Sequence, residues 1–260
     1  MCGIIGYVGN KNFIDVSKEC LKKLEYRGYD SAGIAYFEKY NKNNNKDNNA
    51  EQNNRIVAKK EVGNVKHLFE TIKDKPNTTC GIGHTRWATN GKPTKNNAHP
   101  HKSQDGTFYV VHNGVIENCE KIKQKYLKDV IFESNTDTEI IPNLIALFYK
   151  TTNDTLKSIQ KTTEILKGSF SFCVIHCSEP NKIFFAKYKS PLLIGIGKNE
   201  NFISSDLQGL DNQIEEYIPL EDNNLGYITK DEILVLDKNF RKINTKPQKN
   251  RKKMIKNDIF

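Results

Sequence analysis

Met1-Cys2-Gly3-Ile4-Ile5-Gly6-Tyr7-Val8-Gly9 opens the chain and decides how the rest of it is interpreted. Cysteine is small enough to permit removal of Met1, and Cys2 then carries a thiol and a free α-amine on one α-carbon. An α-amine has a pKa of about 7.7–8.0, so near neutral pH part of it can accept a proton. A nucleophile activated by an N-terminal amine is a known catalytic arrangement. The apolar run predicts a buried strand, and Cys2 is either a nucleophile or simply the residue before that strand.

Length and composition predict one large domain or at most two small ones. The 37% of hydrophobic residues, with thirteen Phe and eleven Tyr, are ample for a packed core. A net charge of +9 is compatible with an anionic partner, but much of the excess is local. Residues 246–256 hold six Lys or Arg and no acidic residue, so we expect a solvated basic tail there in preference to a nucleic-acid site.

Cysteine usage predicts a reduced, cytoplasmic protein. No two cysteines form a Cys-x-x-Cys pair, and their scatter does not look like a disulfide framework. The segment 173–177 could be interpreted as a metal site, but its alternating pattern favours a strand. No apolar run approaches the roughly 20 residues of a membrane helix, and no signal peptide is evident. The six cysteines are Cys2, Cys20, Cys80, Cys119, Cys173 and Cys177.

Apolar periodicity divides the chain into helices and short strands. Helices are expected at 13–25 and 65–74, the latter capped by Asn64, and after the capping stretches 134–139 and 153–154. Turn signals separate six short strands in the last third, which predicts two packed sheets with helices outside. The expected strands are 34–37, 55–62, the segment from 80, 107–112, 169–176, 182–187, 192–196, 202–204, 225–228 and 233–236.

One insert interrupts this pattern. Residues 41–54 contain eight Asn among fourteen positions and no large apolar side chain. Such a segment buries too little to offset its ordering entropy, so we expect a disordered insert at 40–54 between two strands of a hairpin. The expected organisation is a single domain over 2–240 and a basic tail or linker over 241–260.

The centre of the chain is dense in reactive side chains. Three histidines close in sequence suggest zinc, but their spacing matches no standard ligand set, so no metal is expected. No Gly-x-Gly-x-x-Gly or P-loop string is present, and no cofactor is predicted.

Six ordered motifs together resemble class II glutamine amidotransferase domains, over roughly residues 2–237. The second and third more narrowly resemble the glutaminase domain of the glutamine–fructose-6-phosphate aminotransferases. The motifs are Cys2-Gly3-Ile4-Ile5-Gly6, Leu24-Glu25-Tyr26-Arg27-Gly28-Tyr29-Asp30-Ser31-Ala32-Gly33, His84-Thr85-Arg86-Trp87-Ala88-Thr89, Asn97-Ala98-His99-Pro100-His101, Val111-His112-Asn113-Gly114 and Thr136-Asp137-Thr138-Glu139.

The resemblance implies an α+β fold of the N-terminal-nucleophile hydrolase type, a four-layer αββα sandwich. It implies that Cys2 attacks the side-chain amide of L-glutamine and forms a thioester. Asn113 Nδ2 and the Gly114 N–H then stabilise the oxyanion, a type of contribution often worth a few kcal/mol per donor. Taken singly, Asn113-Gly114 is typical of a hairpin turn.

Recognition of free glutamine is implied for three further residues. Arg86 suits the α-carboxylate through a bidentate fork, Asp137 the α-ammonium, and Thr89 adds a hydroxyl contact. Singly, Arg86 is typical of a surface charge and Asp137 of a helix cap. The resemblance also makes Arg27 a support near Cys2 and Trp87 a gate for ammonia. Asn90 stands where the family usually has His.

The family also implies a partner. A sugar-isomerase half that uses fructose 6-phosphate, and makes glucosamine 6-phosphate, is expected after about residue 240 and is not in this chain. The chain could be an excised domain, a truncated product or one subunit of a split enzyme. Three alternatives to this function remain: an amidotransferase serving another acceptor, a non-catalytic regulatory module of the same fold, and a basic nucleic-acid binder.

Overall fold

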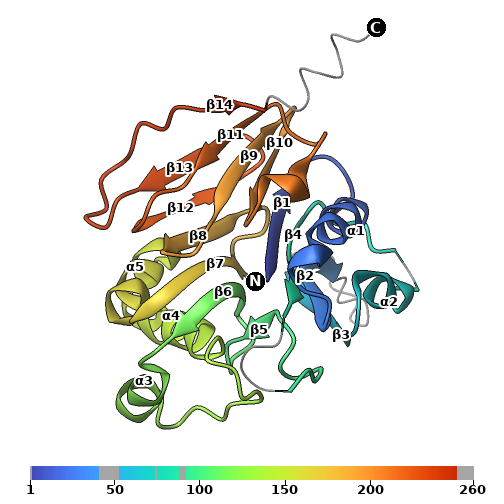
Figure 1. The fold of residues 1–260 in the computed structure, drawn as a ribbon. Helices are drawn as coiled ribbons and strands as arrows, with labels where there is room; N and C mark the ends of the chain where they lie inside the picture. Colours follow the sequence, from blue (N-terminus) through green and yellow to red (C-terminus); the bar gives the residue numbers. More distant parts are fainter. Residues whose placement is uncertain (1, 41–52, 74, 88–91, 251–260) are drawn as a thin grey trace, which may run out of the picture.

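The computed structural model describes residues 2–40, 53–73, 75–87 and 92–250. Two antiparallel sheets form the centre of this part of the chain (Figure 1). The larger has the order β14-β11-β9-β10-β1-β4-β2-β3, and the smaller has the order β13-β12-β8-β7-β6-β5. The strands are β1 (Gly3–Val8), β2 (Ser31–Tyr40), β3 (Asn53–Val62), β4 (Cys80–Arg86), β5 (His101–Lys102), β6 (Phe108–Ile116), β7 (Gly168–His176), β8 (Ile183–Tyr188), β9 (Leu193–Gly197), β10 (Glu200–Ser204), β11 (Glu216–Pro219), β12 (Asn224–Ile228), β13 (Ile233–Leu236) and β14 (Gln248–Lys249).

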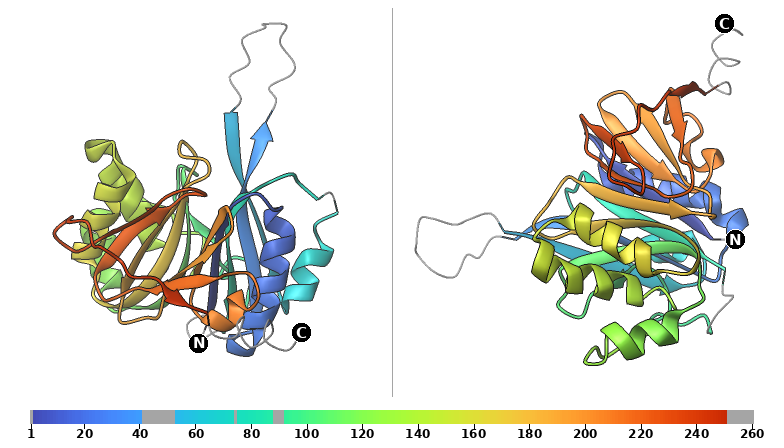
Figure 2. Two further views of the ribbon diagram at one scale, coloured as in Figure 1. Left: turned by 90° about the horizontal axis from the view of Figure 1, so that it is seen from above. Right: turned by 90° about the vertical axis from the view of Figure 1, so that its left-hand side faces the viewer.

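Helices cover the outer face of each sheet (Figure 2), which confirms the predicted αββα order of layers. Helices α1 and α2 pack on the eight-stranded sheet, and α4 and α5 pack on the six-stranded sheet. The α-helices are α1 (Phe13–Leu24), α2 (Val65–Glu70), α3 (Cys119–Tyr126), α4 (Ile140–Thr152) and α5 (Thr155–Ile165), and the 3₁₀ helices are η1 (Glu25–Arg27) and η2 (Leu207–Leu210).

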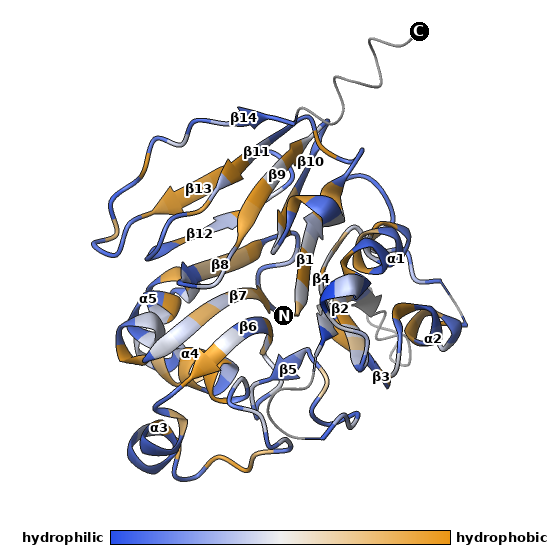
Figure 3. Ribbon diagram, viewed as in Figure 1, coloured by the Kyte–Doolittle hydropathy of each residue, from blue (hydrophilic) through white to orange (hydrophobic). Residues whose placement is uncertain are grey.

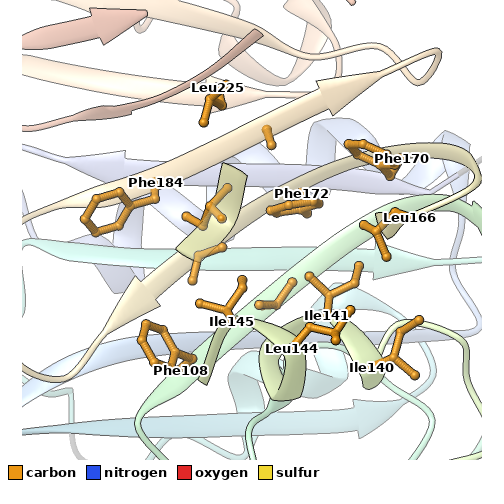
Figure 4. Packing of buried hydrophobic residues seen from close by; sticks show 14 of the residues in the cluster. Phe108, Ile140, Ile141, Leu144, Ile145, Leu166, Phe170, Phe172, Phe184 and Leu225 are labelled. Carbon is orange, nitrogen blue, oxygen red and sulfur yellow. The ribbon is translucent and has the colours of Figure 1, made fainter. Parts of the chain in front are cut away.

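Three clusters of buried hydrophobic side chains lie between successive layers. The middle cluster joins the two sheets, with Ile4 of β1 and Val111 of β6 among its members. A fully buried aliphatic or aromatic side chain contributes about 1.5–3 kcal/mol, so these clusters hold the layers together. In the cluster under α4, shown in Figure 4, helix residues meet strand aromatics: Ile140, Ile141, Leu144 and Ile145 pack near Phe108, Phe170, Phe172 and Phe184.

Helix starts follow the predicted caps with one exception. The Asn64 side chain accepts from the His67 N–H at 3.0 Å, and Asp154 caps α5 through the Lys157 N–H at 3.0 Å. The exception is 134–139, where α4 has no side-chain cap. Glu139 instead accepts from the Ser134 N–H and hydroxyl, since these buried donors need a partner before the helix begins.

Other elements escaped prediction because their sequences carry little apolar pattern. Helix α3 is largely hydrophilic (Figure 3) and buries Ile122 as its single fully covered side chain. Strands β5 and β14 have two residues each, too few for an alternation to register. The helix expected at 65–74 ends at Glu70, where Thr71 caps it.

The hairpin around the Asn-rich insert is confirmed. Strands β2 and β3 pair from Ser31 opposite Val62 to Tyr40 opposite Asn53. The insert prediction itself concerns residues that, apart from Tyr40, Asn53 and Asn54, lie outside the described part of the chain.

The expectation of a tail or linker from residue 241 is wrong for the part up to residue 250, which packs on the domain. Ile243 packs against the cluster between the sheets, and Gln248–Lys249 pairs with β11 at the sheet edge. Asn250 is buried, and its N–H donates to Glu215 O. These contacts extend the domain at least to residue 250. The sequence did not indicate this, because Ile243 is the one large apolar residue among the basic and polar residues 241–250.

Candidate active site

Cys2 lies at the head of β1, beside the end of β4. Gly3 pairs with Thr85, so β4 delivers Arg86 and then Trp87 next to the Cys2 thiol. The Trp87 N–H donates to Cys2 Sγ at 3.2 Å, and Sγ lies 3.6 Å from Trp87 O. Gly28 makes room for this backbone, since a Cβ there would lie 2.6 Å from Trp87 N. The nucleophile predicted from the opening stretch is therefore held by a main-chain donor.

Burial raises the pKa of the Cys2 thiol above its usual range. The hydrogen bond from the Trp87 N–H and the charge of Arg86 oppose this effect, and the carboxylate of Asp30 adds to it. Because burial dominates, the thiol carries its proton near neutral pH. It therefore needs a base to become a nucleophile.

Asn113, on β6 of the opposite sheet, reaches across to Cys2. Its Nδ2 donates to Cys2 O at 2.9 Å, while its Oδ1 lies 2.9 Å from His84 Nε2. The side chain is 8% exposed. One of its two N–H groups is engaged by Cys2 O, and the second is available to a group near the thiol. The structure thus brings the predicted oxyanion donor to the nucleophile, although the two residues lie on different sheets.

Gly114 follows in β6, two residues before the strand ends at Ile116, in a conformation that requires glycine. Its φ is +133°, and a Cβ would lie 2.0 Å from Ser169 O. Two residues later, the Ile116 N–H donates to Asp137 Oδ2 at 2.6 Å. Asp137 is therefore fixed against this end of β6 by its carboxylate rather than serving as a helix cap.

Arg86 combines burial with charged neighbours. Its side chain is 4% exposed, and burial lowers the pKa of the guanidinium. The thiolate form of Cys2 and the carboxylates of Asp30 and Asp137 act in the opposite direction, so all three groups lie within electrostatic reach of it. A buried cation and carboxylates beside a thiol can bind the two charged α-groups of a free amino acid.

The side chains of the two predicted supporting residues, Arg27 and Trp87, contact neighbours other than Cys2. Arg27 of η1 forms an ion pair with Asp206, and its Nε donates to Tyr26 Oη at 3.0 Å. This network joins η1 to η2, whose first turn Asp206 caps. The Trp87 ring is 43% exposed and makes an edge contact with Tyr29, with ring centroids 5.5 Å apart.

Two sequence positions cannot be placed, and two others gain importance. Thr89 and Asn90 lie outside the described residues. The motif that contains Asp30 predicts no role for this residue, but the pairing of Ser31 with Arg86 brings Asp30 to the site. His84 also lacked a role, and its contact with Asn113 depends on sheet-to-sheet packing that no local pattern encodes. Within 2–40, 53–73, 75–87 and 92–250, no cluster of three or more His, Cys, Asp or Glu could hold a metal ion.

A family model described as a glutamine amidotransferase domain matches residues 84–212. Known proteins called glutamine–fructose-6-phosphate aminotransferase (isomerizing) match nearly the whole chain. The one from Geobacillus kaustophilus is 40% identical over 247 residues, which is 95% of this chain and 39% of that protein. The one from Listeria innocua is 44% identical over 231 residues, 89% of this chain and 36% of that protein.

This chain belongs to the glutamine amidotransferase family. A glutamine phosphoribosylpyrophosphate amidotransferase from B. subtilis has the same fold, with a TM-score of 0.73 at 22% identity over 91% of this chain and 49% of that one. The amidotransferase domain described here spans about two fifths of the length of the curated relatives it matches. All six of its cysteines are free, and none of its described helices has the length and apolar character to span a bilayer.

Proposed function

We propose that this amidotransferase domain hydrolyses L-glutamine to glutamate and ammonia through a thioester on Cys2. The observation that carries the proposal is the meeting of the Cys2 thiol, held by the Trp87 N–H, with the Asn113 amide. A thiol, a donor for an oxyanion and a buried cation for a carboxylate are the parts that amide hydrolysis of an amino acid needs.

The first step is attack on the glutamine side-chain amide. Once Met1 is removed, the α-amine of Cys2 accepts the thiol proton, directly or through a water. The Sγ–Cδ bond forms, and the amide oxygen takes up the negative charge. The free N–H of Asn113 Nδ2 and the N–H of Gly114 donate to this oxygen, where each donor is worth about 2.7–4 kcal/mol of transition-state stabilisation.

Two further steps complete the reaction. The α-ammonium returns its proton to the leaving nitrogen, the C–N bond breaks, and ammonia departs from a glutamyl thioester. Water then attacks the thioester while the amine takes its proton. The C–S bond breaks, the amine returns this proton to the leaving thiolate, and glutamate is released. Because the amine acts as base, turnover falls as the pH drops below the pKa of that amine.

Specificity is assigned to the charged neighbours of the thiol. Arg86 binds the α-carboxylate as a bidentate fork, and Asp137 binds the α-ammonium. Thr89 adds a hydroxyl contact, and Trp87 gates the exit of ammonia. Arg27 supports the site indirectly, through Asp206 and η2.

The names of the relatives support one acceptor for the ammonia. We assign this domain as the glutaminase part of a glutamine–fructose-6-phosphate aminotransferase, acting with a sugar-isomerase domain or subunit to make glucosamine 6-phosphate in the cytoplasm. Identities of 40–44% over about nine tenths of the chain support this assignment. Glucosamine 6-phosphate formed from glutamine and fructose 6-phosphate, once the chain is combined with an isomerase half, is the expected result.

A coupled assay of glutamate and ammonia tests the hydrolysis. Wild-type protein should release both in equal amounts, Cys2→Ala should release neither, and Cys177→Ala should match wild type. Cys177 is a suitable control because it is half-buried like Cys2. It follows β7 at the end of the six-stranded sheet that lies opposite Gly114 and Ile116. Turnover by Cys2→Ala, or none by wild type shown to lack Met1, contradicts the proposal.

A further inference from the structure

Four histidines from three segments of the chain lie together in the interior: His84, His99, His101 and His112, here called the histidine cluster. Each is at most 5% exposed, and burial lowers the pKa of all four, that of His84 to about 3. The rings of His84 and His99 stack with centroids 4.0 Å apart and planes 9° apart. Near neutral pH the cluster is uncharged, so its rings act through hydrogen bonds and packing.

The hydrogen bonds fix which atom of His84 carries its proton. Cys2 O can only accept, so Asn113 turns Nδ2 toward it and Oδ1 toward His84. His84 Nε2 faces Asn113 Oδ1 at 2.9 Å and His112 O at 3.1 Å, which are both acceptors. Nε2 therefore carries the hydrogen of the neutral ring, and His84 is the donor that orients the Asn113 amide.

His84 is itself held rigidly. It lies on β4, paired with Ile4 of β1 and Gly33 of β2, and its ring is covered by His99. His99 Nδ1 accepts the N–H of His112 at 3.2 Å, so the stacked ring is tied to the same strand that carries Asn113. A chain of contacts thus runs from the eight-stranded sheet through His84 to Asn113, and back to Cys2.

We propose that His84 is a positioning residue for the oxyanion hole: its Nε2–H locks the Asn113 amide with Nδ2 toward Cys2 and sets the spacing of the two sheets at the reacting centre. This role rests on the proposed glutaminase function. Without the lock, only the bond from Nδ2 to Cys2 O orients the amide, because Oδ1 has lost the His84 donor. The second N–H is then held less firmly toward the oxyanion. The loss falls on the transition state, whereas glutamine binding through Arg86 and Asp137 is unaffected.

Two substitutions separate this role from a packing role. His84→Leu keeps a similar volume but has no donor, whereas His84→Gln places an amide N–H near the position of Nε2. His67→Leu, on the exposed face of α2, is the matched control. The readouts are kcat, KM, and the affinity for glutamate γ-semialdehyde relative to glutamate. The Cys2 thiol adds to the aldehyde to form a hemithioacetal, whose oxygen accepts from the same oxyanion-hole donors, Asn113 and Gly114. The ratio of the two affinities does not depend on the fraction of protein that is folded.

We expect His84→Leu to lower kcat by about 10- to 100-fold and the aldehyde-to-glutamate affinity ratio by a similar factor, with KM within about threefold of wild type. His84→Gln should recover kcat to within about fivefold. Equal losses in the Leu and Gln variants, or a Leu variant whose affinity ratio is unchanged, would overturn the positioning role while leaving the glutaminase function standing. A wild-type protein that releases no glutamate refutes both.

Discussion

Replacing Asn113 with alanine removes one amide whose two sides have assigned partners. The substitution removes the hydrogen bond from Nδ2 to Cys2 O, at 2.9 Å, and the one from His84 Nε2 to Oδ1, also at 2.9 Å. His84 keeps His112 O at 3.1 Å, so its donor stays satisfied. Cys2 O loses the Asn113 donor, which lowers the free energy of unfolding by about 1–3 kcal/mol.

The catalytic effect should be larger than the effect on folding. The N–H that Asn113 offers to the oxyanion acts mainly when charge develops, and removing one such donor typically lowers kcat by about 10²–10³-fold, or about 2.7–4 kcal/mol. KM should stay within about threefold, since Arg86 and Asp137 carry the binding of the α-groups. The effects on kcat and KM should therefore separate.

Steady-state glutamate release at 25 °C, with the melting temperature of each variant, measures both terms. The expected shift is about 2–4 °C per kcal/mol for a domain of this size, which leaves the protein folded during the assay. Asn239→Ala, at an exposed turn, is the matched control. An Asn113→Ala variant with kcat within threefold of wild type would refute the assignment of Asn113 as an oxyanion donor.

Three further predictions concern binding, backbone and pH. Arg86→Lys loses the bidentate fork, so KM for glutamine should rise about 10- to 100-fold with kcat changed little; a fall in kcat alone would argue against carboxylate binding. Gly114→Ala should unfold at least about 1 kcal/mol more easily than Gly63→Ala, because both have positive φ but a Cβ at Gly114 lies 2.0 Å from Ser169 O, while one at Gly63 has no contact within 4 Å. Equal melting temperatures would contradict it. Burial holds the pKa of His84 at about 3 in the folded state, so between pH 6.5 and about 3 the unfolded chain binds one more proton than the folded chain. The free energy of unfolding therefore falls with falling pH, by up to about 1.4 kcal/mol per pH unit. His84→Gln should reduce this slope in denaturant titrations at several pH values, and an unchanged slope would show that His84 titrates normally.

The fold was predictable wherever the hydrophobic pattern was long. Strands such as β7 and helices such as α1 carry enough periodic apolar residues to be recognised at nearly their observed bounds. Helix α3 buries Ile122 alone, and β14 has two residues, so neither leaves a pattern. The end of the domain was missed for the same reason, because Ile243 is a single apolar contact within a run of basic residues.

The site was predictable as chemistry but not as geometry. The position of Cys2 behind Met1 indicates a nucleophile, and the motifs supply Arg86, Asn113 and Asp137 by resemblance. That Asn113 approaches Cys2 from the opposite sheet depends on the packing of the two sheets, which involves residues more than a hundred positions apart. The part played by His84 could not be seen for this reason, since a buried histidine has the same sequence signature whether it orients a catalytic amide or fills space.

The most direct test of the central claim is the intact mass of the protein before and after reaction with a diazoketone analogue of glutamine. The account predicts a mass that lacks Met1 and gains one adduct, which peptide mapping places on Cys2 and which excess glutamine prevents. Adducts on other cysteines with Cys2 unmodified, or labelling that glutamine does not slow, would contradict a glutamine pocket at this thiol.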